Sequence, residues 1–193
     1  MKKKESSVLG LAIACGLLIG CSSDPLDGEP ISRAGLREVA GHDGECIRIM
    51  WHEAWRYLDA YTSVNGRVVT RTVQDNDTQL WCFTEVETLG WNRVVYTIQH
   101  RTFSGQFLDA FETNHDYRVL LLNAQNNDSQ RWLVTQDPSN PWVERIQQYS
   151  TLRYLDAYPD SDHDYRAVTR PYQNNDSQRW VVDSGGWAGA PSN

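Results

Sequence analysis

The chain has 193 residues, a formal net charge of −7 and 40% hydrophobic residues, enough apolar material for one folded domain. Its 25 acidic side chains outnumber 18 basic ones, and no basic run occurs after residue 4. This balance argues against nucleic acid and against anionic lipid headgroups as electrostatic partners.

Residues 1–20 are predicted to be a lipoprotein signal peptide. Three lysines at residues 2–4 precede an apolar run, residues 8–19, that is too short to span a bilayer. The run leads into Leu18-Ile-Gly-Cys21, which resembles the lipobox of bacterial lipoproteins, whose cysteine is lipidated and becomes the new N-terminus. The resemblance implies a lipid on Cys21 and attachment to the bacterial cell envelope. An ordinary cleaved secretory signal is the alternative.

Both ends of the remaining chain are predicted to have irregular structure. Residues 21–44 contain scattered Gly and Pro and predict a flexible tether, and residues 184–193 predict a disordered tail. Ser22, directly after the lipobox cysteine, indicates the outer membrane. Without residues 1–20 the chain has 15 basic and 24 acidic side chains, so we expect membrane contact through the lipid alone.

Two cysteines are left for the folded domain, because Cys15 leaves with the signal peptide and Cys21 carries the lipid. In an oxidising compartment the pair Cys46 and Cys82 favours a disulfide that closes the first repeat. A redox pair or a metal site is the alternative, but no paired histidines accompany the cysteines.

One motif occurs three times between residues 45 and 183 and defines three units, residues 45–89, 90–138 and 139–183. The motif begins as Tyr57-Leu-Asp-Ala-Tyr61, Phe107-Leu-Asp-Ala-Phe111 and Tyr154-Leu-Asp-Ala-Tyr158. It ends as Gln79-Leu-Trp81, Gln130-Arg-Trp132 and Gln178-Arg-Trp180. Such a near-constant period indicates a fold built from three similar units.

Each unit contains four short β-rich runs separated by turn residues, and no amphipathic helix is evident. The expected strands are 46–50, 57–61, 67–71 and 81–84; then 93–99, 107–111, 117–122 and 132–135; then 143–148, 154–158, 167–170 and 180–182. An open solenoid would need capping repeats at its ends. Because the third copy is as complete as the first, closure around a pseudo-threefold axis is favoured.

This pattern resembles the β-trefoil of the ricin B-like (R-type) lectin family over residues 45–183. The resemblance implies an all-β fold in which the three motif tryptophans pack into a common core and the three glutamines brace the preceding loops. It also implies that the first and fourth strands of a lobe are neighbours, which would bring Cys46 and Cys82 together.

The Leu-Asp-Ala half of the motif carries the functional prediction. Side chains alternate along a strand, so Leu58 and Ala60 should face the core while Tyr57, Asp59 and Tyr61 face outward. A carboxylate between aromatic rings suits a sugar, which has an apolar face and hydroxyl groups. The resemblance implies sugar-binding aspartates, and the candidates are Asp59, Tyr61, Gln79, Asp109, Phe111, Gln130, Asp156, Tyr158 and Gln178. In the alternative reading, each aspartate caps its own hairpin or pairs with Arg71 or Arg170.

The sequence departs from the family at two positions in every lobe. The usual aromatic platform, 12 residues before the motif tryptophan, is replaced by Val69, Leu120 and Val168. The asparagine before the glutamine is replaced by Thr78, Ser129 and Ser177. Further candidates therefore lie at the hairpin tips: His115, Tyr117, His163 and Tyr165. The matching tips of lobes 2 and 3 predict that these two lobes resemble each other most.

Composition and motifs point away from catalysis. The repeated aspartates belong to different lobes, too far apart for a glycosidase pair. The run from Asp160 to Asp164 begins like a calcium loop, but Tyr165 and Pro171 replace the required glycine and glutamate. We therefore predict a non-catalytic, envelope-anchored glycan-binding module without cofactor or metal. The alternative is a protein-binding trefoil, either a protease inhibitor or an envelope or toxin scaffold.

Overall fold

The protein folds as twelve strands in three sets of four. The structure, a computed structural model, describes residues 42–61, 66–90, 93–110 and 117–183, with the backbone alone at Tyr61 and Asp183. Lobe 1 contains β1 (Cys46–Trp51), β2 (Arg56–Tyr61), β3 (Arg67–Arg71) and β4 (Trp81–Thr88). Lobe 2 contains β5 (Arg93–His100), β6 (Gln106–Ala110), β7 (Val119–Asn123) and β8 (Arg131–Asp137). Lobe 3 contains β9 (Asn140–Gln148), β10 (Tyr154–Ala157), β11 (Ala167–Arg170) and β12 (Trp180–Asp183).

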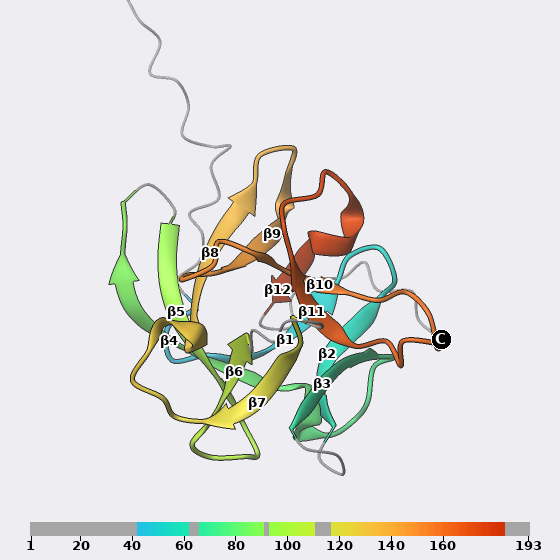
Figure 1. Cartoon of the computed structure of the whole chain (residues 1–193), viewed down its shortest axis with the longest axis horizontal. Helices are drawn as coiled ribbons and strands as arrows, with labels where there is room; N and C mark the ends of the chain where they lie inside the picture. The colour runs from blue at the N-terminus through green and yellow to red at the C-terminus, as the bar shows by residue number, and fades with distance from the viewer. Residues whose placement is uncertain (1–41, 62–65, 91–92, 111–116, 184–193) are drawn as a thin grey trace, which may run out of the picture. The chain divides into compact units, whose positions relative to one another are not determined.

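The first and fourth strands of the three lobes close a barrel, and the hairpins formed by the second and third strands cap it (Figure 1). The first and fourth strands of the lobes pair in the ring β1–β4–β5–β8–β9–β12, and β12 returns to β1. The hairpins β2–β3, β6–β7 and β10–β11 meet through the β3–β7 ladder and two isolated bridges, Val69 to Arg166 and Arg118 to Val168. This is a β-trefoil, so the predicted all-β fold of three lobes is confirmed.

The motif tryptophans form the centre of the core, as the resemblance implied. Trp81, Trp132 and Trp180 are fully buried in one cluster of aliphatic and aromatic side chains. Each indole Nε1 donates to a carbonyl of its own hairpin, on Leu58, Leu108 and Leu155, at 2.9–3.0 Å. The only polar atom of each ring is thereby satisfied, which makes burial of so large a side chain favourable.

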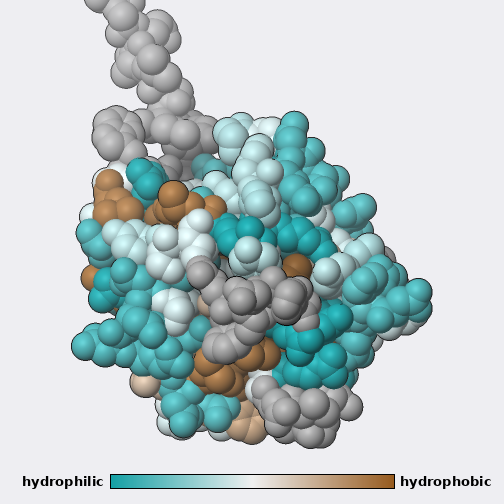
Figure 2. All heavy atoms as spheres, viewed as in Figure 1, coloured by the Kyte–Doolittle hydropathy of each residue, from teal (hydrophilic) through white to brown (hydrophobic). Residues whose placement is uncertain are grey.

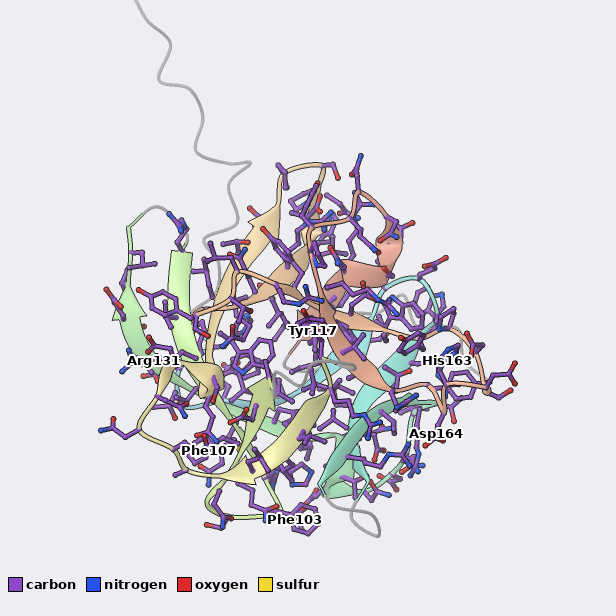
Figure 3. The ribbon with its side chains drawn as sticks, viewed as in Figure 1. Phe103, Phe107, Tyr117, Arg131, His163 and Asp164 are labelled. Carbon is purple, nitrogen blue, oxygen red and sulfur yellow. A yellow bond between two sulfur atoms is a disulfide. The ribbon has the colours of Figure 1, made fainter. Side chains whose placement is uncertain are left out.

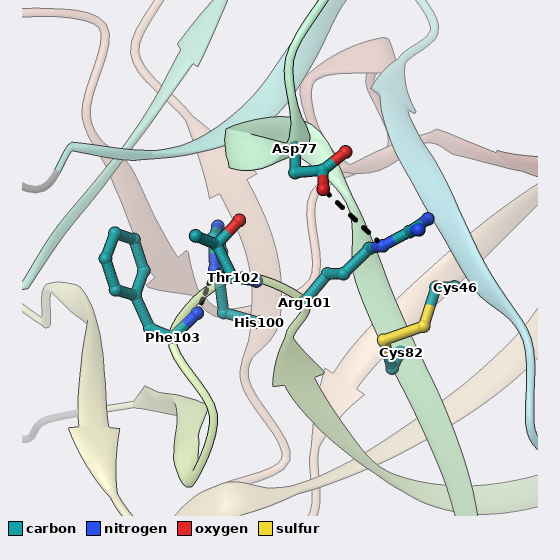
Figure 4. Close-up of a disulfide and its surroundings, with 7 residues drawn as sticks. All are labelled: Cys46, Asp77, Cys82, His100, Arg101, Thr102 and Phe103. Atoms are coloured by element: carbon teal, nitrogen blue, oxygen red, sulfur yellow. Dashed lines mark hydrogen bonds and ion pairs between the residues drawn. A yellow bond between two sulfur atoms is a disulfide. The ribbon is translucent and has the colours of Figure 1, made fainter.

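The predicted disulfide is confirmed. Cys46 on β1 and Cys82 on β4 are direct partners in an antiparallel ladder, and their sulfur atoms are bonded (Figure 4). The bond joins the first and fourth strands of lobe 1 at the wall of the barrel.

A short 3₁₀ helix precedes the fourth strand of each lobe and was not expected from the sequence. The helices are η2 (Asp77–Gln79), η3 (Asp128–Gln130) and η4 (Asp176–Gln178). Asn76 and Asn127 cap the first two by accepting bonds from the backbone of Thr78 and Ser129. These turns carry the motif glutamines, and they lie against the second strand of their own lobe.

In each lobe a buried side chain near the end of the first strand donates a hydrogen bond to the preceding lobe. We call this bond a latch. The indole Nε1 of Trp51 donates to the carbonyl of Asp176, and the amide of Gln148 donates to that of Asp128. In lobe 2 the same task falls to His100, whose Nε2 lies 3.1 Å from the carbonyl of Thr78. Three corresponding bonds from three different residue types therefore close the ring of lobes, although the acceptor in lobe 1 lies one residue later in its 3₁₀ turn than the acceptors in lobes 2 and 3.

No helix in the described part of the chain is long and apolar enough to cross a membrane. The predicted signal peptide, most of the tether and the predicted tail lie outside the described residues.

Candidate functional site

The repeated aspartates are buried, which corrects the prediction that they face outward. Asp59 and Asp156 are 0% exposed and Asp109 is 2% exposed. In each lobe the 3₁₀ turn packs against the strand that carries the aspartate. In each lobe the residue before the motif glutamine donates its hydroxyl hydrogen to the carboxylate: Thr78 to Asp59 (3.2 Å), Ser129 to Asp109 (2.9 Å) and Ser177 to Asp156 (3.2 Å). Strand alternation alone does not reveal this covering turn.

Two of the three carboxylates also face an arginine from the adjacent strand. Arg170 Nη1 donates to Asp156 Oδ1 at 2.7 Å, and Arg71 Nη1 lies 3.8 Å from Asp59 Oδ1. The equivalent residue of lobe 2 is Leu122. The pairing that was predicted as the alternative is therefore present in lobes 1 and 3. Around the aspartate lobes 1 and 3 match and lobe 2 differs, whereas the predicted likeness of lobes 2 and 3 concerns the hairpin tips, of which residues 111–116 lie outside the described residues.

Burial is the main cause of the pKa shift at two of the three aspartates. Desolvation raises the pKa of Asp109, and hydrogen bonds from Ser129 and Gln130 oppose the rise. Desolvation likewise raises the pKa of Asp156, although the charge of Arg170 opposes it. In lobe 2, where Leu122 takes the place of the arginine, hydrogen bonds from Ser129 and Gln130 oppose the effect of burial on the pKa of Asp109.

The motif glutamines brace the loops before them, as the resemblance implied. Gln79 accepts a bond from the backbone N–H of Gln74 and donates to the carbonyl of Thr72, both at 2.9 Å. Gln130 makes the same bonds to Gln125 and Asn123, and Gln178 to Gln173 and Pro171. Gln178 also donates to Asp156 Oδ2 at 3.1 Å. All three side chains are buried, so their amides hold the fold.

The family's platform position lies directly across the ladder from each aspartate. Asp59 pairs with Val69, Asp109 with Leu120 and Asp156 with Val168. Because these three residues are aliphatic, no aromatic ring stands opposite the carboxylate in any lobe.

The tyrosines at the hairpin tips cover arginines of a neighbouring lobe. The Tyr117 ring of lobe 2 lies over the Arg153 guanidinium at 3.6 Å, and the Tyr165 ring of lobe 3 lies over that of Arg56 at 3.7 Å. One face of each ring is therefore occupied by protein. Tyr117 lies near the middle of the molecule in Figure 3, while His163 lies at the outer end of the β10–β11 hairpin.

One surface cluster in lobe 3 combines an aromatic pair with polar groups. We call it the lobe 3 cluster: Tyr158, Asp160, His163 and Arg170. The rings of Tyr158 and His163 stack with their centroids 4.1 Å apart and an interplanar angle of 5°. The Arg170 guanidinium lies 4.3 Å from the Tyr158 centroid while its Nη1 binds Asp156. His163 Nδ1 lies 2.6 Å from Asp160 Oδ1, and this bond lowers the pKa of Asp160.

The cluster unites two predicted candidates, Tyr158 and His163, with two residues that were not singled out for binding. Asp160 and His163 are three residues apart in one turn, a spacing that allows their contact to be anticipated. Arg170 follows from the alternative pairing with Asp156. Of the other candidates, Phe111 and His115 lie outside the described residues, as does the side chain of Tyr61. Within the described residues no group of His, Cys, Asp and Glu side chains is arranged to hold a metal ion.

No protein-family model matches the chain, and no curated protein matches its sequence. Comparison of the structure with solved structures does find matches. The ricin B-like lectin of Macrolepiota procera, solved in complex with lactose, is 20% identical with a TM-score of 0.59, covering 73% of this chain and 96% of that one. SeviL, solved bound to the asialo-GM1 saccharide, is 22% identical with a TM-score of 0.55, covering 74% and 98%.

A designed threefold-symmetric protein, ThreeFoil, is 19% identical with a TM-score of 0.58, covering 71% of this chain and 96% of its own. At these identities the matches establish the fold. The chain has the β-trefoil fold of ricin B-like lectins.

Proposed function

We propose that this protein is a non-catalytic glycan-binding module held on the bacterial envelope by a lipid on Cys21. The lobe 3 cluster carries this proposal. It offers a stacked aromatic pair, a carboxylate and a guanidinium within one surface turn and its adjoining strand. A sugar needs an aromatic ring for its C–H face and fixed donors and acceptors for its hydroxyl groups.

The lobe 3 cluster is accessible to a ligand, whereas the repeated aspartates are not. The side chains of His163 and Asp160 are 46% and 45% exposed, whereas Asp156 is fully buried behind Arg170. In this lobe, therefore, Asp156 positions Arg170, and the outer groups contact the sugar. Because the His163 ring and the Arg170 guanidinium both lie on the Tyr158 ring, the glycan packs against the outer face of the His163 ring.

Several weak sites would act together on a membrane surface. A single sugar contact of this kind is weak, and many anchored copies facing a glycan-rich surface gain affinity through avidity. Lobe 2 carries the same tip sequence, from His115 to Arg118, and supplies a second candidate site.

A glycan array tests binding, using residues 22–193, which contain the whole described fold. Lactose, the ligand of the Macrolepiota procera lectin structure, belongs among the probes. We expect the wild type to bind, and we expect Tyr158→Ala and His163→Ala each to weaken binding at least about tenfold, because each variant removes one ring of the stacked pair. The control is Tyr172→Ala, an exposed tyrosine of the same lobe outside the cluster. Absence of binding by the wild type, or equal loss in the control, would refute the proposal.

Metabolic labelling with a fatty acid tests the anchor. The expected result is label on the wild-type chain that fractionates with the outer membrane, and no label on a Cys21→Ser variant. Label retained by Cys21→Ser would contradict lipidation at this residue.

The alternative is a protein-binding trefoil, an inhibitor or a scaffold. It is favoured by the aliphatic residues opposite all three aspartates, which remove the usual sugar platform. Crosslinking in envelope extracts separates the two readings, since one stoichiometric protein partner that competing sugars do not displace would support the alternative.

A further inference from the structure

The ring of His163 is held in one orientation at the surface of lobe 3. It stacks on Tyr158 with the centroids 4.1 Å apart, and its Nδ1 lies 2.6 Å from Asp160 Oδ1. The backbone N–H of His163 donates to the same carboxylate oxygen at 3.0 Å. Within the described part of the chain, the ring makes its hydrogen bond through Nδ1, which leaves the second nitrogen, Nε2, for a ligand.

This part of the molecule is open to solvent. The side chain of His163 is 46% exposed. Figure 2 shows hydrophilic surface at the right of the view, the end of the molecule where Figure 3 places His163. A ligand that packs against the outer face of the His163 ring therefore comes within reach of Nε2.

The bond to Asp160 decides which ring nitrogen carries hydrogen. The hydrogen bond from His163 lowers the pKa of Asp160, so this carboxyl group is ionised at neutral pH and can only accept. Nδ1 therefore carries hydrogen in the neutral ring as well as in the protonated ring. As a result, Nε2 is an acceptor in the neutral ring and becomes a donor when the ring takes up a proton.

The charged groups around His163 favour negative charge as long as its ring is neutral. These groups, from its own turn and from the elements packed against the cluster, are Asp156, Asp160, Asp162, Asp164, Arg67, Arg166 and Arg170. Their carboxylates outnumber their guanidinium groups by one, which disfavours an anionic ligand. One proton on His163 restores the balance.

A hydroxyl group and a carboxylate respond differently to that proton. A hydroxyl group can donate to neutral Nε2 or accept from protonated Nε2, so a neutral sugar is satisfied in both states. A carboxylate can only accept, so it meets a lone pair on the neutral ring and gains a charge-assisted bond from the protonated ring. Histidine is the side chain that gains its proton between pH 8 and pH 5.

We propose that Nε2 of His163 determines which class of sugar the lobe 3 cluster accepts. Neutral sugars bind with either form of the ring, and sugars that carry a carboxylate bind when the ring is protonated. Mild acid therefore opens the site to acidic glycans. This inference rests on the proposed function, because it concerns the same surface.

NMR titration of residues 22–193 with methyl galactoside and with methyl galacturonoside, at pH 7.5 and 5.5, tests the proposal. The two probes differ only at C6, which carries a hydroxyl group in one and a carboxylate in the other. From pH 7.5 to pH 5.5 we expect the affinity for the galacturonoside to rise at least about fivefold. The affinity for the galactoside should stay within about twofold, which also shows that the fold persists at pH 5.5.

Two histidine variants assign the effect. His163→Phe keeps an aromatic ring but takes up no proton, so the rise in galacturonoside affinity should disappear. His52→Gln removes an imidazole of lobe 1, outside the lobe 3 cluster, and should retain the rise. A rise that persists in His163→Phe would overturn the proposal, as would a wild type that binds the galactoside but shows no rise. If neither probe binds, this inference fails together with galactoside binding at the cluster.

Nitrogen-15 NMR of the free protein tests the chemistry of the ring without any sugar. At pH 7.5 we expect the His163 ring to carry its hydrogen on Nδ1, because the Asp160 carboxylate accepts it. A ring with its hydrogen on Nε2 would overturn the inference while leaving the glycan-binding proposal to the array.

Discussion

Gly66, Tyr117 and Tyr165 hold equivalent positions at the hairpin tips, and all three have a positive φ, between 36° and 64°. Their carbonyl groups accept bonds from the neighbouring lobe, at Leu121, Thr169 and Thr70 respectively, over 2.6–2.8 Å. The left-handed backbone conformation at these positions therefore serves to interlock the three hairpins. Only the glycine lies too close to its neighbour to carry a side chain, since an added Cβ would lie 2.3 Å from the carbonyl oxygen of Leu121.

Gly66→Ala should lower the free energy of unfolding by more than about 2 kcal/mol, because it adds left-handed strain to a clash with backbone. Gly105→Ala is the matched control. Its φ is also positive, at 81°, but an added Cβ meets nothing within 4 Å. We expect the control to cost about 1 kcal/mol. Urea unfolding measures both, and equal losses would contradict the interlocking role of Gly66.

Asp109→Asn should leave the stability at pH 7 unchanged or raise it by up to about 1 kcal/mol. The buried carboxylate has a raised pKa, so its charged form is disfavoured, and an amide can still accept the bond from Ser129. The contrasting variant is Asp137→Asn. Arg145 Nε donates to the Asp137 carboxylate at 2.7 Å and Arg179 Nε at 3.2 Å.

Loss of the Asp137 charge should cost on the order of 3 kcal/mol, because Arg145 is itself buried. Chemical denaturation of the two variants gives the comparison. If Asp109→Asn proved as damaging as Asp137→Asn, the carboxylate of lobe 2 would have a partner that this account omits.

At the scale of elements, the repeat allowed all twelve strands to be predicted, because strand positions follow from alternation and turn residues. The 3₁₀ turns were missed because three-residue helices leave no periodic signal. Burial of Asp59, Asp109 and Asp156 was missed for a related reason. Alternation indicates which residues share a face, but only the fold shows that the turn before the fourth strand covers that face.

The latches between lobes could not be predicted from the sequence either. Trp51, His100 and Gln148 make the same bond to the preceding 3₁₀ segment. They share an N–H donor but differ in side-chain shape, so no motif search would align them. The lobe 3 cluster was predictable in part, because Tyr158 and His163 follow from the motif, while their stacking depends on the path of the turn.

Removing the disulfide should cost about 3–4 kcal/mol, since it closes a loop of 36 residues in the unfolded chain. The variant Cys46→Ala/Cys82→Ala, compared with the oxidised wild type by urea unfolding, gives this value. Reduced wild type should unfold like the double variant. A difference below about 1 kcal/mol would show that the barrel wall of lobe 1 does not depend on the bond.

At the scale of the whole molecule, one buried histidine should make closure of the lobes sensitive to pH. Burial lowers the pKa of His100, and its Nδ1 accepts bonds from the N–H groups of Thr102 and Phe103, each 3.1 Å long (Figure 4). The folded state therefore holds the neutral ring. The unfolded chain takes up the proton near its ordinary pKa of about 6.5, so stability is lost as the pH falls below that value.

His100 should contribute a loss of at most about 1.4 kcal/mol per pH unit below pH 6.5. His100→Gln places the residue of the equivalent lobe 3 latch at this position and should flatten this part of the profile. Urea unfolding at pH 7, 6 and 5 provides the measurement. An unaltered slope in the variant would assign the pH dependence to other groups.

Asp137 should cause a second loss of folding stability at lower pH. Burial tends to raise its pKa, but bonds from Ser139 and Arg179 and the charge of Arg145 outweigh this and lower the pKa to about 2. Because the folded pKa lies below the unfolded value, this stabilisation is present above about pH 4 and disappears as the pH falls through 2. It amounts to on the order of 2 kcal/mol.

The glycan-binding proposal assigns the sugar to the lobe 3 cluster of a β-trefoil whose repeated aspartates are buried. An NMR titration of residues 22–193 with the best glycan from the array locates the binding surface. We expect saturable shifts at Tyr158, Asp160 and His163, with the Asp59 amide unmoved. Shifts confined to other surfaces, or no shifts at saturating glycan, would contradict it.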